Sequence, residues 1–201
     1  MVTTTPQSIL DFWFGYSGDD ATIANAQAKL WWAKNAETDA LIRTRYASLV
    51  DSALAGELTS WGETPHGELA RIILLDQFPR NIYREQPRAF AYDMQALSWT
   101  LEGLAKQSDQ QLRPVERVFF YLPLEHAEDL GHQETSVKLF RELVEAVPQE
   151  QRNTFAGFFD FAVRHHDIID RFGRFPHRNV ILGRESTSEE EEFLTQPGSS
   201  F

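Results

Sequence analysis

Cysteine is absent from the 201 residues of the chain. This absence excludes disulfide bonds, thiolate nucleophiles and zinc sites that depend on sulfur ligands. Long apolar runs are absent too, since no segment approaches the roughly 20 uninterrupted apolar residues of a membrane-spanning helix. Residues 1–6 carry neither positive charge nor an apolar stretch, so we expect no signal peptide. Together these absences predict a soluble, cytoplasmic protein.

Positive charge is scarce, because 19 Lys and Arg stand against 30 Asp and Glu and leave a net charge of −11. A nucleic acid is held mainly by an excess of cations that release its counterions, and anionic lipid also attracts basic segments. We therefore expect neither nucleic acid nor membrane as a partner. At 42% hydrophobic residues, the chain is too apolar for disorder and long enough to bury a core.

Strand signals are poor, since no alternating apolar and polar run is bounded by hairpin turns. Helical signals are frequent instead. Thr5 and Pro6, and again Thr64 and Pro65, pair a capping residue with a proline at the first helical position. Residues 69–75 are apolar on most faces, which predicts a central helix. We predict an all-α fold.

Further helices are expected in the second half of the chain. Helical spacing predicts them over residues 87–106, 125–147 and 149–172. Thr187 and Glu190 form the capping box of a short last helix. Short turns between the helices predict antiparallel hairpins within one domain, residues 1–201. Residues 168–179 weakly resemble residues 74–81 in sequence. This similarity favours an origin of the chain in two related halves, about 1–106 and 107–201, over two helix ends that are similar by chance.

The segment 171–184 is the most distinctive part of the sequence, with four arginines, one histidine and no acid. Guanidinium groups suit carboxylate or phosphate, so one hypothesis is an anion-binding loop. The alternative is that these arginines pair with the protein's own carboxylates. A similar turn follows residue 75, and both turns could face one cavity. The candidate ligand-binding residues are Asp76, Arg80, Asn81, Arg171, Arg174, His177, Arg178, Asn179 and Arg184.

An acidic stretch suggests a metal site at first sight. On one helix, Glu125, Asp129 and His132 would share a face, with the spacing of half a carboxylate-bridged di-metal site. A second acid-x-x-His motif on another predicted helix is missing, so the set of ligands is incomplete. We therefore predict no metal site and no cofactor, and interpret the stretch as a solvated acidic face or a helix-end ion pair.

Histidines next to carboxylates are the catalytic candidates, because a histidine oriented by an acid can act as a general base. The candidate residues are the histidines His126 and His165 and the carboxylate Asp167. No G-x-S-x-G motif, P-loop or G-x-G-x-x-G motif accompanies them. Without a nucleophile, buried hydrogen-bonded pairs are the alternative interpretation. Aromatic residues crowd the first third of the chain and the last long helix, which predicts core packing or an aromatic-lined groove.

Four stretches carry a family resemblance: ILDFWFG at residues 9–15, LLDQFPRN at 74–81, FFYLPLEH at 119–126 and the segment 165–190. Together they resemble a family of bacterial proteins catalogued as domain of unknown function 924. The resemblance implies a tetratricopeptide-like fold, with the hairpins stacked as a right-handed α-α superhelix. It implies no reaction, ligand or partner. His132 and His166 lie outside the family's motif, whereas the catalytic and ligand-binding candidates lie on it.

We predict a helical-repeat-like binding protein whose two arginine-rich turns frame a groove for an anionic small molecule or a peptide. This prediction rests on fold analogy. The alternative is a hydrolase-type enzyme that uses a His–carboxylate pair, and a structural protein–protein interaction module is third. The oligomeric state is not determined by the sequence. Convergence of the arginines and histidines on one pocket would favour binding or catalysis.

Overall fold

The computed structural model describes residues 4–15 and 17–200, and every regular element within these ranges is helical. The predicted all-α class is therefore confirmed for the described chain. The α-helices are α1 (Pro6–Phe14), α2 (Asp20–Trp32), α3 (Ala36–Leu54), α4 (Pro65–Asp76), α5 (Phe78–Ile82), α6 (Asp93–Ala105), α7 (Pro114–Glu125), α8 (Leu130–Ala146), α9 (Arg152–Phe172), α10 (Asn179–Leu182) and α11 (Ser188–Leu194). The 3-10 turns are η1 (Thr59–Glu63), η2 (Pro87–Ala89), η3 (Ser108–Gln111), η4 (Gln149–Gln151) and η5 (Pro176–Arg178).

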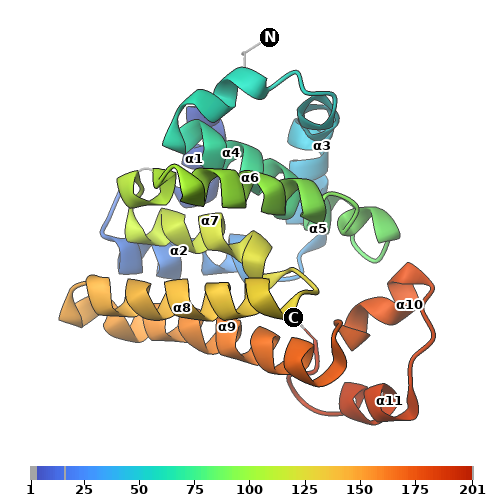
Figure 1. The fold of residues 1–201 in the computed structure, drawn as a ribbon. Coiled ribbons are helices and arrows are strands. Elements are labelled where there is room, and N and C mark those ends of the chain that lie inside the picture. Colours follow the sequence, from blue (N-terminus) through green and yellow to red (C-terminus); the bar gives the residue numbers. More distant parts are fainter. Residues whose placement is uncertain (1–3, 16, 201) are drawn as a thin grey trace.

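The central helix is α4, as its apolar sequence predicts (Figure 1). Leu69, Ile72 and Leu75 on it have no exposed surface. The helices α1, α3, α6 and α7 all pack against α4, so its faces meet protein rather than water. Full burial of each such side chain contributes about 1.5–3 kcal/mol, which makes this helix a main source of the stability of the fold.

A second layer lies below this bundle and consists of the long hairpin α8–α9 (Figure 1). Pro148 and the turn η4 reverse the chain between the two helices. The predicted antiparallel hairpins are thus present. The helices α2 and α7 join the two layers, since both also pack against α9. Stacking into a right-handed superhelix and an origin in two related halves remain predictions.

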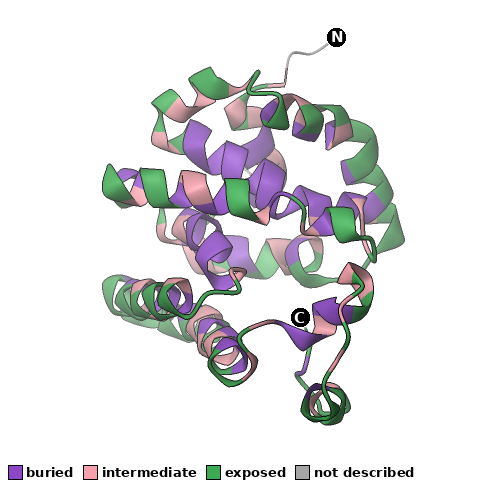
Figure 2. Cartoon of the chain, turned by 45° about the vertical axis from the view of Figure 1, so that its right-hand side comes forward, coloured by how far each residue is buried: buried purple, intermediate pink, exposed green. Residues whose placement is uncertain are grey.

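An aromatic cluster fills the junction between α1, α2 and α7. Phe119 is fully buried at its centre. The Phe119 ring centroid lies 5.5 Å from that of Trp13, 4.6 Å from that of Trp31 and 5.7 Å from that of Trp32, over which it stacks. Buried residues lie on the inner faces of the helices, and exposed residues cover the outside (Figure 2).

The predicted capping residues are found at the helix starts. The side-chain oxygens of Thr5, Thr64 and Thr187 each accept a hydrogen bond from a backbone N–H in the first turn. Thr187 forms the predicted capping box with Glu190, whose side chain accepts from the Thr187 N–H at 2.8 Å. Such caps satisfy N–H groups that have no partner within the helix.

Two helix boundaries differ from the prediction. The helix expected from residue 87 begins at Asp93, because η2 and a turn precede it. The helix expected from Glu125 to residue 147 is two helices, since α7 ends at Glu125 and α8 starts at Leu130. The buried amide of Gln133 stabilises this turn by donating to the backbone carbonyls of Glu125 and Ala127 at 2.6 and 2.8 Å.

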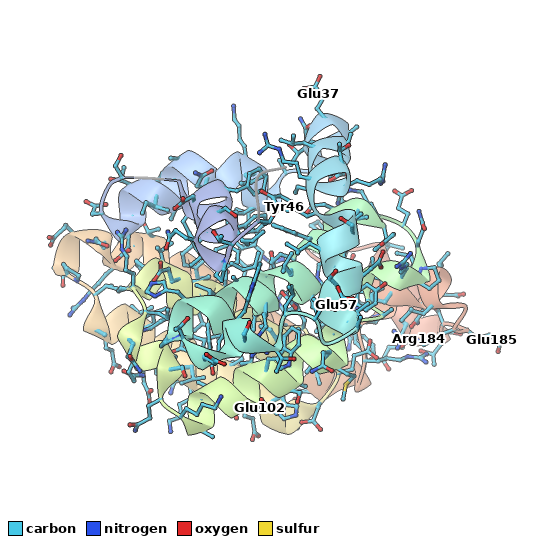
Figure 3. The ribbon with its side chains drawn as sticks, turned by 90° about the horizontal axis from the view of Figure 1, so that it is seen from above. Glu37, Tyr46, Glu57, Glu102, Arg184 and Glu185 are labelled. Atoms are coloured by element: carbon cyan, nitrogen blue, oxygen red, sulfur yellow. The ribbon has the colours of Figure 1, made fainter. Side chains whose placement is uncertain are left out.

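The C-terminal segment folds back beside the end of α9 as η5, α10 and α11 (Figure 1). A small apolar cluster, with Ile168, Ile169 and Phe175 at its centre, attaches it to α9. Ion pairs of Arg171, Arg174 and Arg184 reinforce the attachment. Figure 3 shows two exposed acids, Glu37 on α3 and Glu185 in the C-terminal segment, that point outward. None of the helices in the described residues is long and apolar enough to span a bilayer.

Alanine substitutions at two glycines, one within α9 and one at its C-terminal end, are expected to change the stability of the fold in opposite directions. Gly173 ends the helix at a φ of 66°, in the left-handed region, whereas Gly157 lies within the helix. A Cβ added at either position meets no atom within 4 Å. Gly173→Ala should therefore destabilise by about 1–2 kcal/mol through backbone strain alone. Gly157→Ala should stabilise by about 0.5–1 kcal/mol. Urea unfolding of both variants checks this, and equal signs would contradict it.

Candidate functional site

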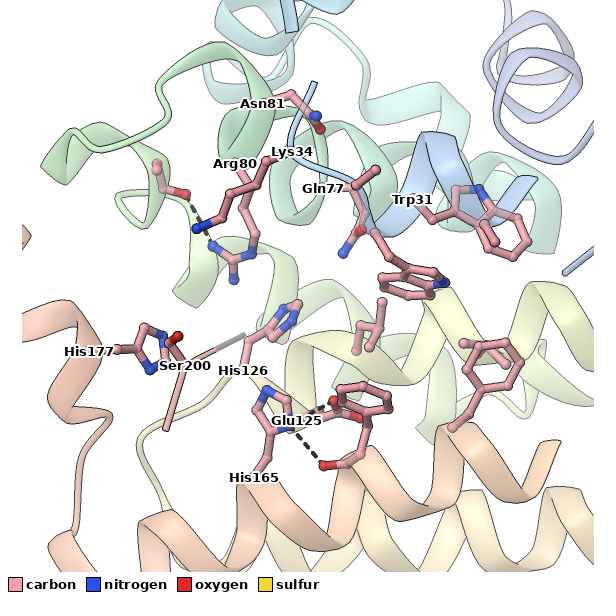
Figure 4. A pocket seen from close by; sticks show the side chains of 18 of the residues that line it. Trp31, Lys34, Gln77, Arg80, Asn81, Glu125, His126, His165, His177 and Ser200 are labelled. Atoms are coloured by element: carbon pink, nitrogen blue, oxygen red, sulfur yellow. Dashed lines mark hydrogen bonds and ion pairs between the residues drawn. The ribbon is translucent and has the colours of Figure 1, made fainter. Parts of the chain in front are cut away.

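A cavity of about 750 Å³ lies between α2, the junction of α4 and α5, α7, α9 and the C-terminal segment (Figure 4). One end, the apolar end, is lined by Trp31, Trp32, Val118, Leu122 and Phe158. The other, the polar end, is lined by Lys34, Gln77, Arg80, Glu125, His126, His165, His177 and Arg178. Cavities of this size enclose drug-sized ligands, and a mostly apolar wall with a few convergent polar groups is typical of them.

The polar end depends on the break between α4 and α5. Pro79 cannot continue a helix, so α4 ends at Asp76 and the chain turns at Gln77 before α5. Asp76 is fully buried behind the cavity wall and accepts a hydrogen bond from the Gln77 amide. One turn further on, Arg80 reaches back to Asp76, with 3.6 Å between Nη2 and Oδ1.

Asp76 also holds the ring of His126, whose Nδ1 lies 2.7 Å from Asp76 Oδ1. Burial favours the neutral ring and lowers the pKa of His126, although the charge of Asp76 acts to raise it. Burial acts to raise the pKa of Asp76 as well, but His126 and Arg80 outweigh it and leave that pKa below its ordinary value. A carboxylate can only accept, so Nδ1 of His126 carries the proton and Nε2 keeps its lone pair.

Glu125 and His165 form a second pair at the polar end. His165 Nδ1 lies 2.8 Å from the backbone oxygen of Phe161 and 3.1 Å from Glu125 Oε1. Burial, helped by the charge of Asp76, raises the pKa of Glu125 to about 8, so this carboxyl is protonated at neutral pH. Its other oxygen, Oε2, is buried and has no hydrogen-bond partner among the described residues. Burial lowers the pKa of His165 well below its ordinary value, which keeps the ring neutral.

Two guanidinium groups meet beside the histidines. Arg80 Nη2 and Arg178 Nη1 lie 3.1 and 3.4 Å from the same oxygen, Oδ2 of Asp93. The ring of Phe90 lies under both, with centroid distances of 5.3 and 4.8 Å. Burial and the neighbouring Arg80 lower the pKa of Arg178 to about 10, so it stays charged at neutral pH. Burial and Arg178 lower the pKa of His177 to about 3.

The structure divides the predicted ligand-binding residues into two groups. Arg80, Asn81, His177 and Arg178 line the cavity, and Asp76 lies behind its wall. The two similar turns predicted from the sequence thus face one space. Among the catalytic candidates, His126 and His165 line the same space. Asp167 does not line it; this exposed residue contacts the neighbouring His166 at 3.4 Å.

The remaining arginines hold the C-terminal segment in place. Arg174 makes a two-pronged ion pair with Glu190, at 2.6 and 2.7 Å. Arg184 does the same with Glu128, at 2.6 and 2.9 Å. Arg171 pairs with Glu189, and the amide of Asn179 donates to Ser186 and Glu190. For these four residues the structure shows intramolecular pairing rather than cavity lining.

The acidic stretch does not form the single helical face expected of a metal site. Glu125 ends α7, whereas Asp129 caps α8 by accepting from the His132 N–H at 3.0 Å. The chain turns between them, so the assumed spacing along one helix is wrong. No group of three potential metal ligands comes together within residues 4–15 and 17–200.

Several lining residues carry no signal in the sequence. Lys34 lies between two helices, and nothing in its surroundings marks it as functional. Gln77 lies within the distinctive stretch 74–81, but its own residue type gave no reason to select it. Asp93, which joins the two arginines, begins α6 and resembles any acid in a first helical turn. Trp31 and Trp32 were candidates for an aromatic-lined groove, and they do line the cavity.

The chain matches the family described as "Bacterial protein of unknown function (DUF924)" over residues 9–198. It belongs to this family. The solved structure titled "Structure of Protein of Unknown Function ATU0120 from Agrobacterium tumefaciens" is similar, with 35% sequence identity and a TM-score of 0.79. The similarity covers 94% of this chain and 96% of that chain. None of the curated proteins matches. The family resemblance seen in the sequence is therefore confirmed, and it brings no activity with it.

Proposed function

We propose that this DUF924 protein binds a small organic acid whose body is aromatic or aliphatic. The observation that carries the proposal is the division of one 750 Å³ cavity into a cationic end and an apolar end (Figure 4). Arg80 is 22% exposed and lies at the cationic end, with Arg178 behind it and Lys34 beside the opening. Trp31 and Trp32 line the other end.

The charges at the cationic end leave room for an anion. Arg80 and Arg178 share one carboxylate oxygen of Asp93, while Asp76 is occupied by His126 and Gln77 as well as by Arg80. Lys34 makes no ion pair within the described part of the chain. Burial lowers the pKa of all three histidines of the cavity and keeps them neutral, so the positive charge of this end comes from Arg80, Arg178 and Lys34. A ligand carboxylate would complete the partners of these cations.

The limited volume of the cavity supports a small molecule over a peptide. A volume of about 750 Å³ suits a ligand of drug-like size, whereas a peptide on a helical array usually lies along an extended groove. The ligand's aromatic or aliphatic body would replace water against the tryptophans. Burial of apolar surface contributes about 25 cal/mol per Å², so affinity should rise with the size of the body.

The test is calorimetric titration with indole-3-acetate and with its neutral amide. We expect the acid to bind the protein and the amide to bind at least tenfold more weakly. Arg178→Ala removes a charged partner worth about 1.5–3 kcal/mol, and should weaken the acid about 10- to 100-fold while leaving the amide unchanged. Asp93 keeps Arg80 as a partner in this variant, so the fold should survive.

Arg174→Ala is the matched control, because it deletes an arginine of the same turn that pairs with Glu190 outside the cavity. It should leave both affinities unchanged. Lys34→Met adds a variant on an exposed side chain that has no ion-pair partner to lose among the described residues. Equal affinity for the acid and the amide in the natural protein, or equal loss in the two arginine variants, would overturn the proposal.

A further inference from the structure

The polar end of the cavity holds a proton acceptor and a proton donor next to each other. His126 and Glu125 are consecutive residues at the end of α7, and both line the cavity. Asp76 accepts from His126 Nδ1 at 2.7 Å and so leaves Nε2 as the basic nitrogen. This is the arrangement in which a carboxylate orients a histidine for general-base catalysis.

The carboxyl of Glu125 is the complementary group. Its side chain is only 4% exposed, and its Oε2 has no partner within the described residues although it is buried at the cavity wall. A neutral carboxylic acid in an apolar site can donate a hydrogen bond to a developing oxyanion. Environments that push two neighbouring groups into opposite protonation states identify an acid and a base. Here the acid is Glu125 and the base is His126.

Among the described residues, the cavity offers no activated nucleophile beside these groups. Cysteine is absent, and the hydroxyl groups among the lining residues belong to Thr154 and Ser200. Neither hydroxyl is hydrogen-bonded to a histidine in residues 4–15 and 17–200. Covalent hydrolysis would need such a nucleophile. Proton transfer at carbon needs only the base, the acid and an anchor for the substrate.

We propose that the cavity catalyses enolisation of a 2-oxo acid with an aromatic or aliphatic side chain. This proposal rests on the proposed function, because Arg80 and Lys34 would hold the substrate carboxylate. In the step, Nε2 of His126 takes a proton from the carbon next to the keto group. The electrons of the broken C–H bond form the C=C bond, and the carbonyl electron pair moves to oxygen. That oxygen takes the proton of Glu125 and yields the enol.

The chemistry of the cavity selects this substrate class. A 2-oxo acid carries a carboxylate directly beside a keto oxygen, so one anchored end presents both the oxygen for Glu125 and the acidic C–H for His126. Its side chain would extend towards Trp31 and Trp32 at the apolar end. Reversal of the step with solvent protons regenerates both side chains, and no metal, oxidant or second substrate takes part.

The experiment follows phenylpyruvate in D₂O by proton NMR and measures the loss of the signal from its C3 protons. We expect the full chain to accelerate this exchange above the buffer rate. His126→Gln should slow the enzymatic exchange by about 10²-fold or more, the usual contribution of a general base. His66→Gln is the matched control, since His66 is exposed and lies outside the cavity, and its exchange should be unchanged.

Glu125→Gln provides a second test that does not depend on the histidine variant folding. The amide is nearly the same size as the carboxyl and still donates a hydrogen bond, but it cannot transfer its proton. Exchange should slow by about 10²-fold, while calorimetric affinity for phenylpyruvate stays within a factor of a few. A parallel loss of affinity and rate would indicate a binding role for Glu125 and overturn its assignment as the acid.

Calorimetry on the same samples separates the two proposals. Binding of phenylpyruvate without acceleration of exchange would overturn the enolisation proposal and leave the binding proposal in place. Absence of binding to phenylpyruvate and indole-3-acetate alike would overturn the binding proposal itself. Acceleration that survives His126→Gln would overturn the assignment of the base.

Discussion

Glu125→Gln is expected to remove a large pH dependence from the stability of the protein. Burial raises the pKa of Glu125 from 4.5 to about 8 in the folded chain. Between these two values the unfolded chain has released the proton and the folded chain retains it. Raising the pH through this window therefore favours unfolding, by about 1.4 kcal/mol per pH unit. The stabilisation is complete below pH 4.5 and is lost as the pH rises to about 8.

The expected loss over the whole window is on the order of 5 kcal/mol. The measurement is the free energy of unfolding in urea at pH 5 and pH 8, for the natural chain and for Glu125→Gln. The variant should gain stability relative to the natural chain by several kcal/mol between these pH values, because its amide does not ionise. Both proteins contain the cavity histidines, so the difference in their free energies of unfolding reports on Glu125 alone. The histidines themselves lower the free energy of unfolding as the pH falls through 6.5. A difference in the free energy of unfolding between the two proteins that is the same at pH 5 and pH 8 would contradict the prediction.

Phe119→Ala is expected to lower the free energy of unfolding by about 3–5 kcal/mol, the usual effect of truncating a fully buried aromatic residue. Phe119 is 0% exposed and packs between Trp13, Trp31 and Trp32. The remaining aromatic rings cannot fill the space without moving. Because Trp31 and Trp32 also form the apolar end of the cavity, affinity for aromatic acids should fall together with stability.

Val180→Ala is the control for this substitution. Val180 is 86% exposed, and its truncation should change stability by less than about 0.5 kcal/mol. Thermal unfolding and calorimetric titration with indole-3-acetate measure both effects. A loss of stability without any change in the affinity for aromatic acids would show that the packing of the aromatic cluster does not affect ligand binding. An unchanged stability would show that the cluster is not a main part of the core.

The fold positions a site that no single element contains. Pro79 ends α4 beside Asp76, the turn after Glu125 presents His126, and η5 carries Arg178 back to the bundle. Each of these features is a helix end, where the chain changes direction and side chains converge. Asp93, at the first residue of α6, joins Arg80 to Arg178 and so ties the two similar turns together.

Local sequence signals predict the helical class and most helix starts. Capping and periodicity are local: Thr5, Thr64 and Thr187 act on N–H groups three residues away. The sequence also identified the two turns that contain Arg80 and Arg178. Two boundaries differ from the prediction, the start of α6 at Asp93 and the end of α7 at Glu125. A contact from the next helix determines the second, because the Gln133 amide donates to the backbone carbonyls of that turn.

Tertiary contacts, which local sequence does not show, determine which charged residues pair within the chain and which line the cavity. Arg174, Arg178 and Arg184 lie in one short segment and look alike in sequence. Their partners Glu190, Asp93 and Glu128 are separated from them by 16, 85 and 56 residues. Ion pairing and desolvation depend on distance in space, so nothing local distinguishes these arginines. The same reason explains why burial, rather than sequence, set the protonation states of Glu125 and His126.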